Sequence, residues 1–468
     1  MSHVNCFLIM TLKTRRILYI TCIILFLLTA PPLVLYTTGF RYDWEYRRLV
    51  ETGSLVVKSQ PTGAAIYLNG QLYQEPTPTI INNILPGKIN LEVKKDGYHL
   101  WQKNLAVNPR LTTFVENIKL FLKSETQPYL PAPVTDYWWN GKQDKLIFST
   151  AKELRLYNTL NQKNILIAKL PPGQNPAVSW SPHDDRFIFN QFVIDAGAND
   201  KFTDLATIAP EALKNLQWDP LAPDTIYGLG NKGLYRVPYL IKTARLVKSG
   251  KILNYTLRND KIITLQKTAA NTSLVYFTPS DPGTVLVLAD SVDAGTDNFL
   301  PTNSHRLGLY NSRQKSLTIF DPAIKATSLE DSIIEIPNVD KALWSRDGSR
   351  LVYTSGGAIY QRSFIGPINV IPRPNNAELI TRYSQNVADV FWSDDENYLF
   401  YFVADSLRVL EITASTAPRS LILLSNTSQA KKAGYIFNPA AITFINKDGA
   451  LKLLPLAEKQ AGTFFFGR

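Results

Sequence analysis

The 468-residue sequence predicts a mainly β protein with an N-terminal transmembrane helix, a small β-sandwich and a seven- or eight-bladed β-propeller, with eight blades favoured. Three observations predict this order. An uncharged apolar run occupies residues 17–36, short alternating segments fill residues 53–122, and a tryptophan-headed pattern recurs about every 42 residues from Trp139 onward. Hydrophobic residues make up 45% and charged residues 19%, so most of the chain is expected to fold.

The run at 17–36 is long enough to cross the hydrocarbon core of a bilayer. Lys13, Arg15 and Arg16 precede it, and such a basic flank stays on the cytoplasmic side of a membrane. The sequence therefore predicts a single-pass protein of the cell membrane with a cytoplasmic N-terminus and an extracytoplasmic bulk.

The expected boundaries are a cytoplasmic tail at 1–16, a transmembrane anchor at 17–38 that contacts the lipid bilayer, and a juxtamembrane linker at 39–52. A cleaved signal peptide is the alternative. Pro31 and Pro32 stand where small residues are needed for cleavage, and the apolar run continues past them, which favours a retained signal anchor.

The formal net charge is +11, and the basic excess is concentrated near the membrane segment. It could favour anionic lipid or a wall polymer, but charge that sets topology and solubility is the favoured interpretation. No stripe of aromatic and basic residues suggests nucleic acid. Cys6 and Cys22 lie in the first 22 residues, so the remaining chain has neither a disulfide nor a thiolate metal site.

Residues 53–122 predict a compact β-sandwich. Half-buried strands are expected at 54–59 and 89–95, where apolar and polar residues nearly alternate. Asn69-Gly70 separates two apolar runs and is a strong hairpin signal. A stiff Pro-rich linker is expected to follow at 123–134, where SETQPYLPAPV occupies 124–134.

This segment resembles the PEGA domain of bacterial and archaeal surface proteins. The motifs that carry the resemblance are SLVVKSQPTGAAIYLNG, TP at 77–78, LPGK at 85–88 and KKDGYHLWQKNLAV. The naming tetrapeptide is present as Pro61-Thr62-Gly63-Ala64, with Thr in place of Glu. The resemblance implies an extracellular β-sandwich, often beside a membrane anchor, and does not imply catalysis. His99 and Trp101 could form a binding patch there, but packing between strands is favoured.

Five tryptophans begin the same local pattern: a Trp, a polar turn, and an apolar run seven or eight residues later. They are Trp139, Trp180, Trp218, Trp344 and Trp392. The gap between the third and fourth equals about three steps, so two repeats without Trp are expected inside it. A last unit starts at Tyr435, which makes eight units over 135–468.

A period of 40 to 45 residues with four short strands per unit is typical of a β-propeller. The units resemble WD-type and Tol-system-type propeller repeats, and each Trp is expected to fill the contact between neighbouring blades. Ring closure needs one more strand in the last blade. Residues 462–468 are the favoured source, because Phe464, Phe465 and Phe466 are unsuited to water, and a strand from 125–137 is the alternative.

Gly228, Gly230 and Gly233 have the G-x-G-x-x-G spacing of a dinucleotide-binding turn. The segment that follows alternates like a strand and contains Pro238, so strand–turn–strand is predicted and no nucleotide is expected to bind. Gly228 and Gly230 are accordingly expected to tolerate alanine with at most a modest loss of stability, unless their φ is positive.

Other chemical signals are weak. The four histidines are His3, His99, His183 and His305. His183 lies in a turn with Asp184 and Asp185, where a metal site is conceivable but an acidic propeller turn is favoured. The segment SDDENY at 393–398 lacks the regular ligand spacing of a calcium loop and is predicted to be a solvated turn. No catalytic, cofactor-binding or metal-ligating residue is predicted, and no cofactor.

The favoured function is a non-enzymatic, membrane-anchored cell-envelope protein whose PEGA-like domain and propeller bind protein or polysaccharide partners. The alternative is a hydrolase or lyase that acts on an envelope or extracellular substrate in the propeller channel. It would need converging acids or histidines, and histidine is scarce. A third hypothesis, a periplasmic partner of an envelope machine, rests on analogy with the Tol-system propeller.

Overall fold

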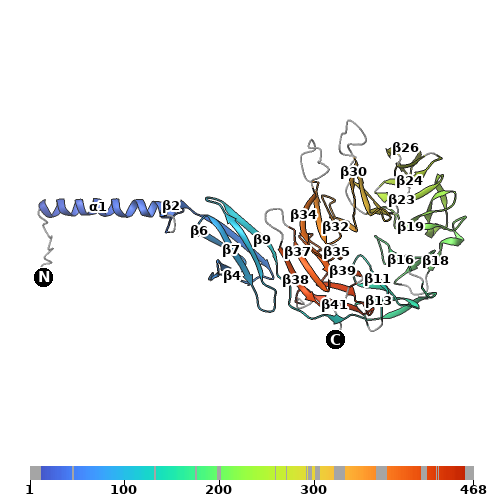
Figure 1. The fold of residues 1–468 in the computed structure, drawn as a ribbon, viewed down its shortest axis with the longest axis horizontal. Coiled ribbons are helices and arrows are strands. Elements are labelled where there is room, and N and C mark those ends of the chain that lie inside the picture. Colours follow the sequence, from blue (N-terminus) through green and yellow to red (C-terminus); the bar gives the residue numbers. More distant parts are fainter. Residues whose placement is uncertain are drawn as a thin grey trace, which may run out of the picture. The chain divides into compact units, whose positions relative to one another are not determined.

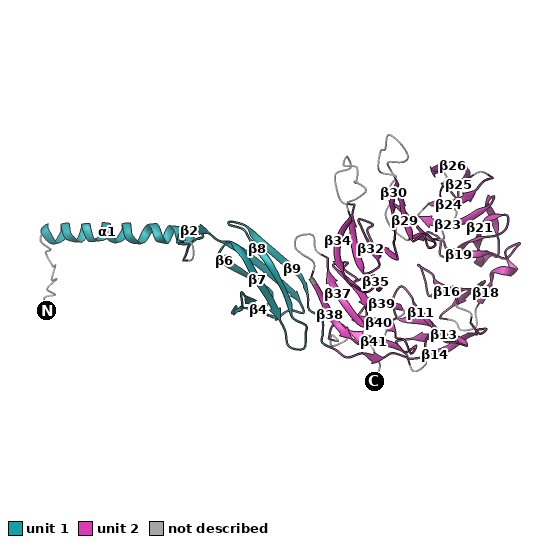
Figure 2. Cartoon of the chain, viewed as in Figure 1, with its two compact units in different colours: residues 1–123 teal, residues 124–468 magenta. Residues whose placement is uncertain are grey.

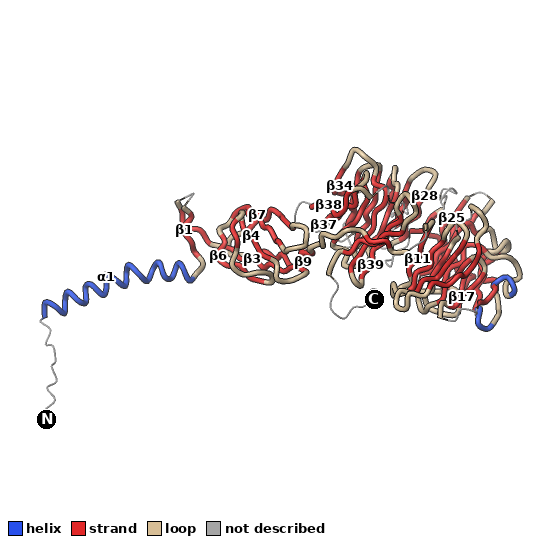
Figure 3. The backbone as a smooth tube through the Cα atoms, turned by 90° about the horizontal axis from the view of Figure 1, so that it is seen from below, coloured by secondary structure: helices blue, strands red, loops and turns tan. Residues whose placement is uncertain are grey.

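The computed structural model describes the chain as two compact units, residues 1–123 and 124–468, shown in different colours in Figure 2. The described residues are 12–44, 47–130, 133–173, 176–197, 202–258, 260–269, 271–290, 292, 298–300, 306–320, 333–364, 377–412, 419–427, 430 and 432–458. Strands make up most of the described chain, as Figure 3 shows in red. The mainly β prediction is confirmed.

Helix α1 (Leu12–Thr37) is formed by the apolar run, and none of its residues is buried. It is the one helix among the described residues that is long and apolar enough to cross a membrane, which makes it a candidate membrane span or signal anchor. Strands β1 (Phe40–Asp43) and β2 (Arg48–Glu51) follow it as an antiparallel hairpin. The segment 39–52, predicted as a linker, therefore contains regular structure.

The rest of the first unit is a sandwich of two sheets. One sheet has the order β6–β3–β9, from β3 (Gly53–Gln60), β6 (Thr79–Ile84) and β9 (Thr112–Lys119). The other has the order β5–β4–β7–β8, from β4 (Ala65–Leu68), β5 (Gln71–Leu72), β7 (Gly87–Lys94) and β8 (Trp101–Val107). Asn69 and Gly70, both with positive φ, form the predicted hairpin turn between β4 and β5.

The alternating side chains of these strands fill the core between the two sheets. Leu55, Val57, Ile66 and Leu91 are fully buried, each on a strand whose neighbouring side chains are more exposed. Trp101 is 2% exposed and packs in the same core. The packing interpretation of Trp101 is thus confirmed.

Among the described residues, the second unit forms eight four-stranded sheets, the blades of a propeller (Figure 1). Seven blades take their strands from consecutive segments. They are blade 1, β11 (Asp136–Trp139), β12 (Lys145–Ser149), β13 (Glu153–Asn158) and β14 (Asn164–Lys169); blade 2, β15 (Val178–Trp180), β16 (Arg186–Phe189), β17 (Phe192–Asp195) and β18 (Phe202–Asp204); blade 3, β19 (Lys214–Trp218), β20 (Thr225–Leu229), β21 (Gly233–Pro238) and β22 (Arg245–Ser249); blade 4, β23 (Ile252–Arg258), β24 (Lys261–Lys267), β25 (Thr272–Thr278) and β26 (Asp281–Ala289); blade 5, β27 (Asn298–Leu300), β28 (Leu307–Asn311), β29 (Ser316–Phe320) and β30 (Ile333–Ile336); blade 6, β31 (Lys341–Trp344), β32 (Arg350–Ser355), β33 (Ala358–Ser363) and β34 (Ala377–Arg382); and blade 7, β35 (Val387–Trp392), β36 (Tyr398–Val403), β37 (Ser406–Glu411) and β38 (Arg419–Ser425). The count of eight and the two blades without Trp between Trp218 and Trp344 are confirmed.

Blade 8 has the order β10–β41–β40–β39, from β39 (Lys432–Phe437), β40 (Ala440–Ile445), β41 (Leu451–Pro455) and β10 (Gln127–Pro128). The favoured closure by residues 462–468 is therefore wrong, and the alternative strand from 125–137 closes the ring. Residues 459–468 lie outside the described part of the chain. The physical reason is burial: Tyr129 and Leu130, just after β10, are buried against Leu451 and Leu453. The segment predicted as a Pro-rich linker thus contributes a strand and part of the core.

Each tryptophan of the repeat packs against the preceding blade. Trp180 Nε1 donates to the carbonyl oxygen of Trp138 in blade 1 at 3.0 Å, and Trp218 Nε1 donates to that of Ser179 in blade 2 at 3.0 Å. Trp344 lies in a hydrophobic cluster with residues of blade 5, and Trp392 packs against a cluster that contains residues of blade 6. The predicted role of the tryptophans in sealing the seams between blades is confirmed.

The residue that follows each of these tryptophans is polar and buried. The five are Asn140, Ser181, Asp219, Ser345 and Ser393, none more than 8% exposed. Their side-chain oxygens accept hydrogen bonds from backbone N–H groups of the turn that follows, as at Asn140 from Asp144 and at Ser345 from Arg350. The Trp–polar pair therefore fixes both the seam and the first turn of the blade.

Candidate functional site

The G-x-G-x-x-G segment is strand–turn–strand, as predicted: β20 ends at Leu229, and β21 begins at Gly233. The carboxylate of Glu211 accepts hydrogen bonds from the backbone N–H of Asn231 at 2.8 Å and of Lys232 at 3.2 Å. Burial raises the pKa of Glu211, but these bonds outweigh it and hold the pKa below its usual value. The turn thus has an anion-binding geometry whose anion is the protein's own carboxylate.

The geometry argues against the expected tolerance of Gly228 and Gly230 to alanine, which stays a prediction to be measured. A Cβ at Gly228 would lie 2.9 Å from the Cβ of Leu213 and 2.7 Å from the Cδ2 of Leu216. At Gly230 it would lie 2.4 Å from Glu211 Oε1. Neither glycine has a positive φ, so the constraint is close packing and not backbone conformation. Sequence spacing carries no information on such contacts.

His183 and its acidic neighbours form contacts between blades. His183 Nε2 lies 3.0 Å from the carbonyl oxygen of Asp219, in blade 3. Asp185 accepts from Lys145 Nζ at 2.5 Å and from Asn140 Nδ2 at 3.2 Å, both in blade 1. Asp184 contacts Arg186 within the same blade. The favoured interpretation as an acidic propeller turn fits this geometry, since His183 and Asp185 contact neighbouring blades and Asp184 orders the turn itself.

The SDDENY turn also reaches a neighbouring blade. Glu396 accepts from the backbone N–H of Arg346, and its carbonyl oxygen accepts from Arg350 Nη2 at 2.9 Å. Asp395 accepts from Ser393 Oγ at 2.5 Å within the turn. The prediction of a merely solvated turn needs this correction: the turn bridges blades 6 and 7.

Charged side chains at the start of innermost strands pair across seams. Lys432 of β39 contacts Asp136 of β11, and Lys341 of β31 contacts Asp389 of β35. Asp389 also accepts from the backbone N–H of Ala433 at 3.2 Å. Within the described ranges, no group of three or more His, Cys, Asp or Glu is placed to hold a metal ion.

The seam between blades 3 and 4 differs from those sealed by Trp. In blade 3, Trp218 pairs with Ile226 across the first hairpin. In blade 4 the pair in the corresponding place is Leu257 and Ile262. Leu257 is smaller than Trp, and the turn that follows it is shorter, so less side-chain volume fills this seam.

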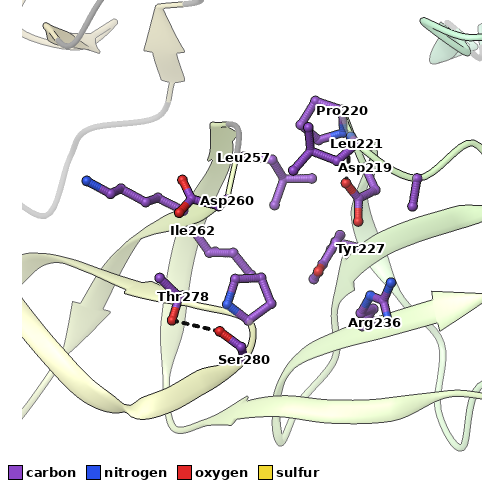
Figure 4. A pocket seen from close by; sticks show the side chains of 13 residues that line it. Asp219, Pro220, Leu221, Tyr227, Arg236, Leu257, Asp260, Ile262, Thr278 and Ser280 are labelled. Atoms are coloured by element: carbon purple, nitrogen blue, oxygen red, sulfur yellow. Dashed lines mark hydrogen bonds between the residues drawn. The ribbon is translucent and has the colours of Figure 1, made fainter.

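A pocket of about 310 Å³ lies in that seam (Figure 4). Tyr227 and Arg236 approach it from blade 3, and Ile262, Thr278 and Ser280 approach it from blade 4. The remaining lining residues are Asp219, Pro220, Leu221, Ala222, Leu257, Asp260, Lys261 and Pro279. The walls therefore combine aliphatic, hydroxyl and charged groups.

A second pocket of about 440 Å³ adjoins the first, because Arg236, Pro279 and Ser280 line both. Its other lining residues are Pro238, Thr243, Arg245, Val247 and Pro282. We call the two together the blade 3–4 groove. Three basic and two acidic side chains line it, so its charge is mixed with a basic excess.

The polar groups of the groove are partly ordered by one another. Burial and the nearby negative charge of Asp219 raise the pKa of Tyr227, while the hydrogen bond to Arg236 opposes them. Asp219 accepts from the backbone N–H of Leu221 at 2.9 Å, which shapes the lip of the first pocket. Lys248, beside the groove, donates to the carbonyl oxygen of Pro282 at 2.7 Å. These contacts fix the blade 3 wall before any ligand binds.

A third pocket, of about 260 Å³, lies between blades 1 and 2, and its lining side chains are all apolar. Phe202 is 66% exposed and meets Phe192 edge to face at 5.7 Å between ring centroids. Leu166 of β14 is 43% exposed on the opposite side. This third pocket is a secondary candidate site, which could hold an apolar side chain of a partner.

No residue of the blade 3–4 groove was singled out from the sequence. The one feature of the sequence that points to the groove is an absence: the repeat at 252–267 lacks the Trp that five other repeats contain. At this seam the missing large side chain leaves a cavity, but the lining residues of the adjacent blade follow only from the fold.

With the geometry in place, the first unit can be compared with known families. Residues 52–121 match the family model of the PEGA domain. The match covers the sandwich from Thr52 to Phe121 and agrees with the resemblance seen in the sequence. No curated protein matches the chain significantly.

Solved structures similar to this chain are β-propellers. The Dos1 propeller is 10% identical, with 72% of this chain and 95% of that chain covered and a TM-score of 0.49. The C-terminal WD40 domain of Sif2 is 9% identical, with coverages of 71% and 99% and a TM-score of 0.44. The propeller domain of Myceliophteria thermophila Cps50 (Swd1) is 12% identical, with coverages of 71% and 98% and a TM-score of 0.41. Likeness at this level carries no argument about function.

Proposed function

We propose that the chain is a non-enzymatic, membrane-anchored scaffold of the cell envelope that binds an extended segment of a protein partner in the blade 3–4 groove. The observation that carries the proposal is the groove itself, two continuous pockets of about 310 and 440 Å³ on one seam of a rigid ring. A propeller presents such a groove on packed strands, which keeps it pre-organised for binding.

The lining chemistry supports a peptide ligand. Leu221, Leu257 and Ile262 offer aliphatic contact, and the hydroxyl groups of Thr278 and Ser280 offer hydrogen bonds to a main chain. Arg236 and Arg245 favour acidic side chains, because a guanidinium binds a carboxylate through two parallel hydrogen bonds. The expected ligand is an extended segment with apolar and acidic residues.

The direct test is selection of random peptides displayed on phage against the full chain in lipid nanodiscs. The proposal expects enriched peptides that combine acidic and apolar residues and that lose binding to the Leu257→Trp variant, whose added ring fills the first pocket. The matched control is Asn161→Trp, on an exposed turn of blade 1. Peptides that bind wild type and both variants equally would overturn the site.

Polysaccharide is the other ligand class to compare. Tyr227 is the one aromatic residue among those lining the groove, and it is 2% exposed, so no ring face is offered for stacking on a sugar. Binding of purified wall polysaccharide that Leu257→Trp abolishes, without any peptide binding, would replace the protein partner in the proposal.

The anchor in this proposal is α1, supported by its length and by Lys13, Arg15 and Arg16 at its start. Protein inserted through α1 should resist extraction by alkaline carbonate. Protease added to intact, wall-stripped cells should then degrade the chain beyond residue 38. Full protection of the chain would contradict the orientation, and release by carbonate would contradict the anchor.

A further inference from the structure

The β1–β2 hairpin exposes apolar and aromatic side chains next to the candidate membrane span. Trp44 is 83% exposed, Leu49 is 53% exposed and Tyr42 is 43% exposed. Neither strand of the hairpin contains a buried residue. The Tyr42 and Trp44 rings meet edge to face at 4.8 Å between centroids and are still largely exposed. Two-stranded hairpins of this size are marginal in water, so these exposed side chains favour a further apolar partner.

The hairpin is tied to the end of α1. The carbonyl oxygen of Gly39 accepts from the backbone N–H of Thr52 at 3.0 Å and from its Oγ1 at 2.8 Å, which closes the base of the hairpin. Arg41 Nη1 donates to the carbonyl oxygen of Tyr36 at 2.8 Å, and its guanidinium lies 3.7 Å from the centroid of the Tyr36 ring. The hairpin therefore starts where the helix ends and is held there.

The depth of the β1–β2 hairpin in the membrane follows from the length of α1. The 26 residues of α1 span about 39 Å at 1.5 Å per residue, against about 30 Å for the hydrocarbon core. A spanning α1 places its end near Thr37 at the level of the headgroups, and Phe40 begins β1 three residues later. Tryptophan and tyrosine favour this depth, because their rings are apolar and their N–H and O–H groups reach water.

The charges of the hairpin suit the same surface. Arg47 is exposed in the turn segment close to Trp44, and guanidinium groups bind phosphate oxygens through paired hydrogen bonds, whereas Arg48 lies opposite Asp43 across the two strands. Glu51, at the far end of β2, contacts Arg110 of the sandwich and so directs its negative charge away from the arginines. The hairpin thus offers aromatic rings and cations together.

We propose that the β1–β2 hairpin is an interfacial membrane-binding element, with Tyr42 and Trp44 among the headgroups and Arg47 against lipid phosphate. This rests on the proposed spanning of the membrane by α1. The occupant is the phospholipid surface itself, and the consequence is that the hairpin fixes the level at which the PEGA domain begins outside the bilayer.

The test uses the full chain in vesicles of phosphatidylcholine and phosphatidylglycerol that contain brominated phosphatidylcholine, a quencher of tryptophan fluorescence. Trp44 is the one tryptophan among residues 1–100, and the next, Trp101, is buried in the sandwich. The proposal expects quenching that is stronger with bromine near the headgroup end of the acyl chain than near its methyl end. Trp44→Phe should abolish that quenching, and Arg47→Glu should reduce it by about half.

Flotation of the vesicles distinguishes anchoring of the chain by α1 from binding of the hairpin to the membrane interface. Protein that fails to float with vesicles would show that α1 does not anchor the chain, which overturns the proposed function. Protein that floats, but shows equal fluorescence with and without bromine, would overturn the interfacial hairpin alone. Protection of Trp44 that depends on protein concentration would assign the surface to a second copy and would equally contradict the lipid assignment.

Discussion

The seam between blades 2 and 3 and the seam between blades 3 and 4 differ chiefly in one side chain. Trp218 is 7% exposed and donates a hydrogen bond to the backbone of blade 2, which seals the first seam. Leu257 takes the equivalent place in blade 4 and is only partly buried. The comparison teaches that replacing Trp by Leu at this one place leaves the blade 3–4 seam underfilled, while Trp218 closes the seam between blades 2 and 3.

The turns of the two blades reinforce this difference. Trp218 pairs with Ile226, so the intervening turn is long and is held by the buried carboxylate of Asp219. Leu257 pairs with Ile262, so its turn is shorter and covers less of the neighbouring blade. A smaller side chain and a shorter turn act in the same direction.

The largest expected difference comes from truncating both side chains. Trp218→Ala removes a buried ring and its hydrogen bond, and should lower the free energy of unfolding of the propeller by about 3–5 kcal/mol. Leu257→Ala acts on a partly buried side chain beside an existing pocket and should cost about 1 kcal/mol. Urea denaturation of the full chain in detergent measures both. Equal losses would break the comparison.

Blade 3 should be intolerant of added volume at Gly228, whose neighbours Leu213 and Leu216 pack in the cluster shared with blade 2. Gly228→Ala places a Cβ 2.9 Å from that of Leu213, and should cost about 1–3 kcal/mol. Gly141→Ala is the matched control, because a Cβ there meets no atom within 4 Å, and it should change stability by less than about 0.5 kcal/mol. The difference between the two melting temperatures checks this prediction. A neutral Gly228→Ala would show that Leu213 and Leu216 can shift to make room for the added methyl group.

Filling the open seam should affect binding more than stability. Leu257→Trp restores the residue of the sealed seams, and should change the free energy of unfolding by less than about 1.5 kcal/mol, since the ring enters an existing pocket. Peptide affinity should fall at least about tenfold, which corresponds to about 1.4 kcal/mol. Calorimetric titration measures the affinity. Unchanged affinity in a folded variant would place the binding site elsewhere.

The smallest expected effect concerns the turn of a Trp-containing blade. Hydrogen bonds from Ser345 Oγ and from Ser349 lower the pKa of Asp347 to about 2. A depressed folded-state pKa stabilises the fold at pH values above the usual pKa of the carboxyl group, and this stabilisation is lost as pH falls from about 4 to about 2. Thermal melts between about pH 6 and about pH 2 should show a slightly shallower acid dependence for Asp347→Asn than for wild type. Identical profiles would count against an ordered turn.

The sequence predicted the repeat, and the repeat predicted most of the fold. Period and tryptophan spacing were enough to place eight blades, because each unit must bury its faces against the next. Ring closure was assigned to the wrong end. Apolar content favoured Phe464 to Phe466, whereas the decisive contacts of Tyr129 and Leu130 with β41 join residues more than 300 positions apart. Hydropathy does not report such distant pairing.

The groove could be anticipated only in part. The absence of Trp from the repeat at 252–267 was visible, and its consequence, an underfilled seam, follows from packing. The identity of the opposite wall was not visible, because Tyr227 and Arg236 belong to another repeat and face the groove only through the register of β20 and β21. The close packing at Gly228 was not visible either, because Leu213 and Leu216 approach it only once β19 pairs with β20.

Site-specific photo-crosslinking in intact cells tests the central claim most directly, that the underfilled seam is the binding site. Benzoylphenylalanine replaces Ser280, which lines the groove, or Asn161, at the corresponding turn of blade 1. The expected result is one adduct of defined mass at position 280 that disappears when Leu257→Trp is added, and no such adduct at position 161. The same adduct at both positions, or an adduct at 280 that persists with Leu257→Trp, would contradict the claim.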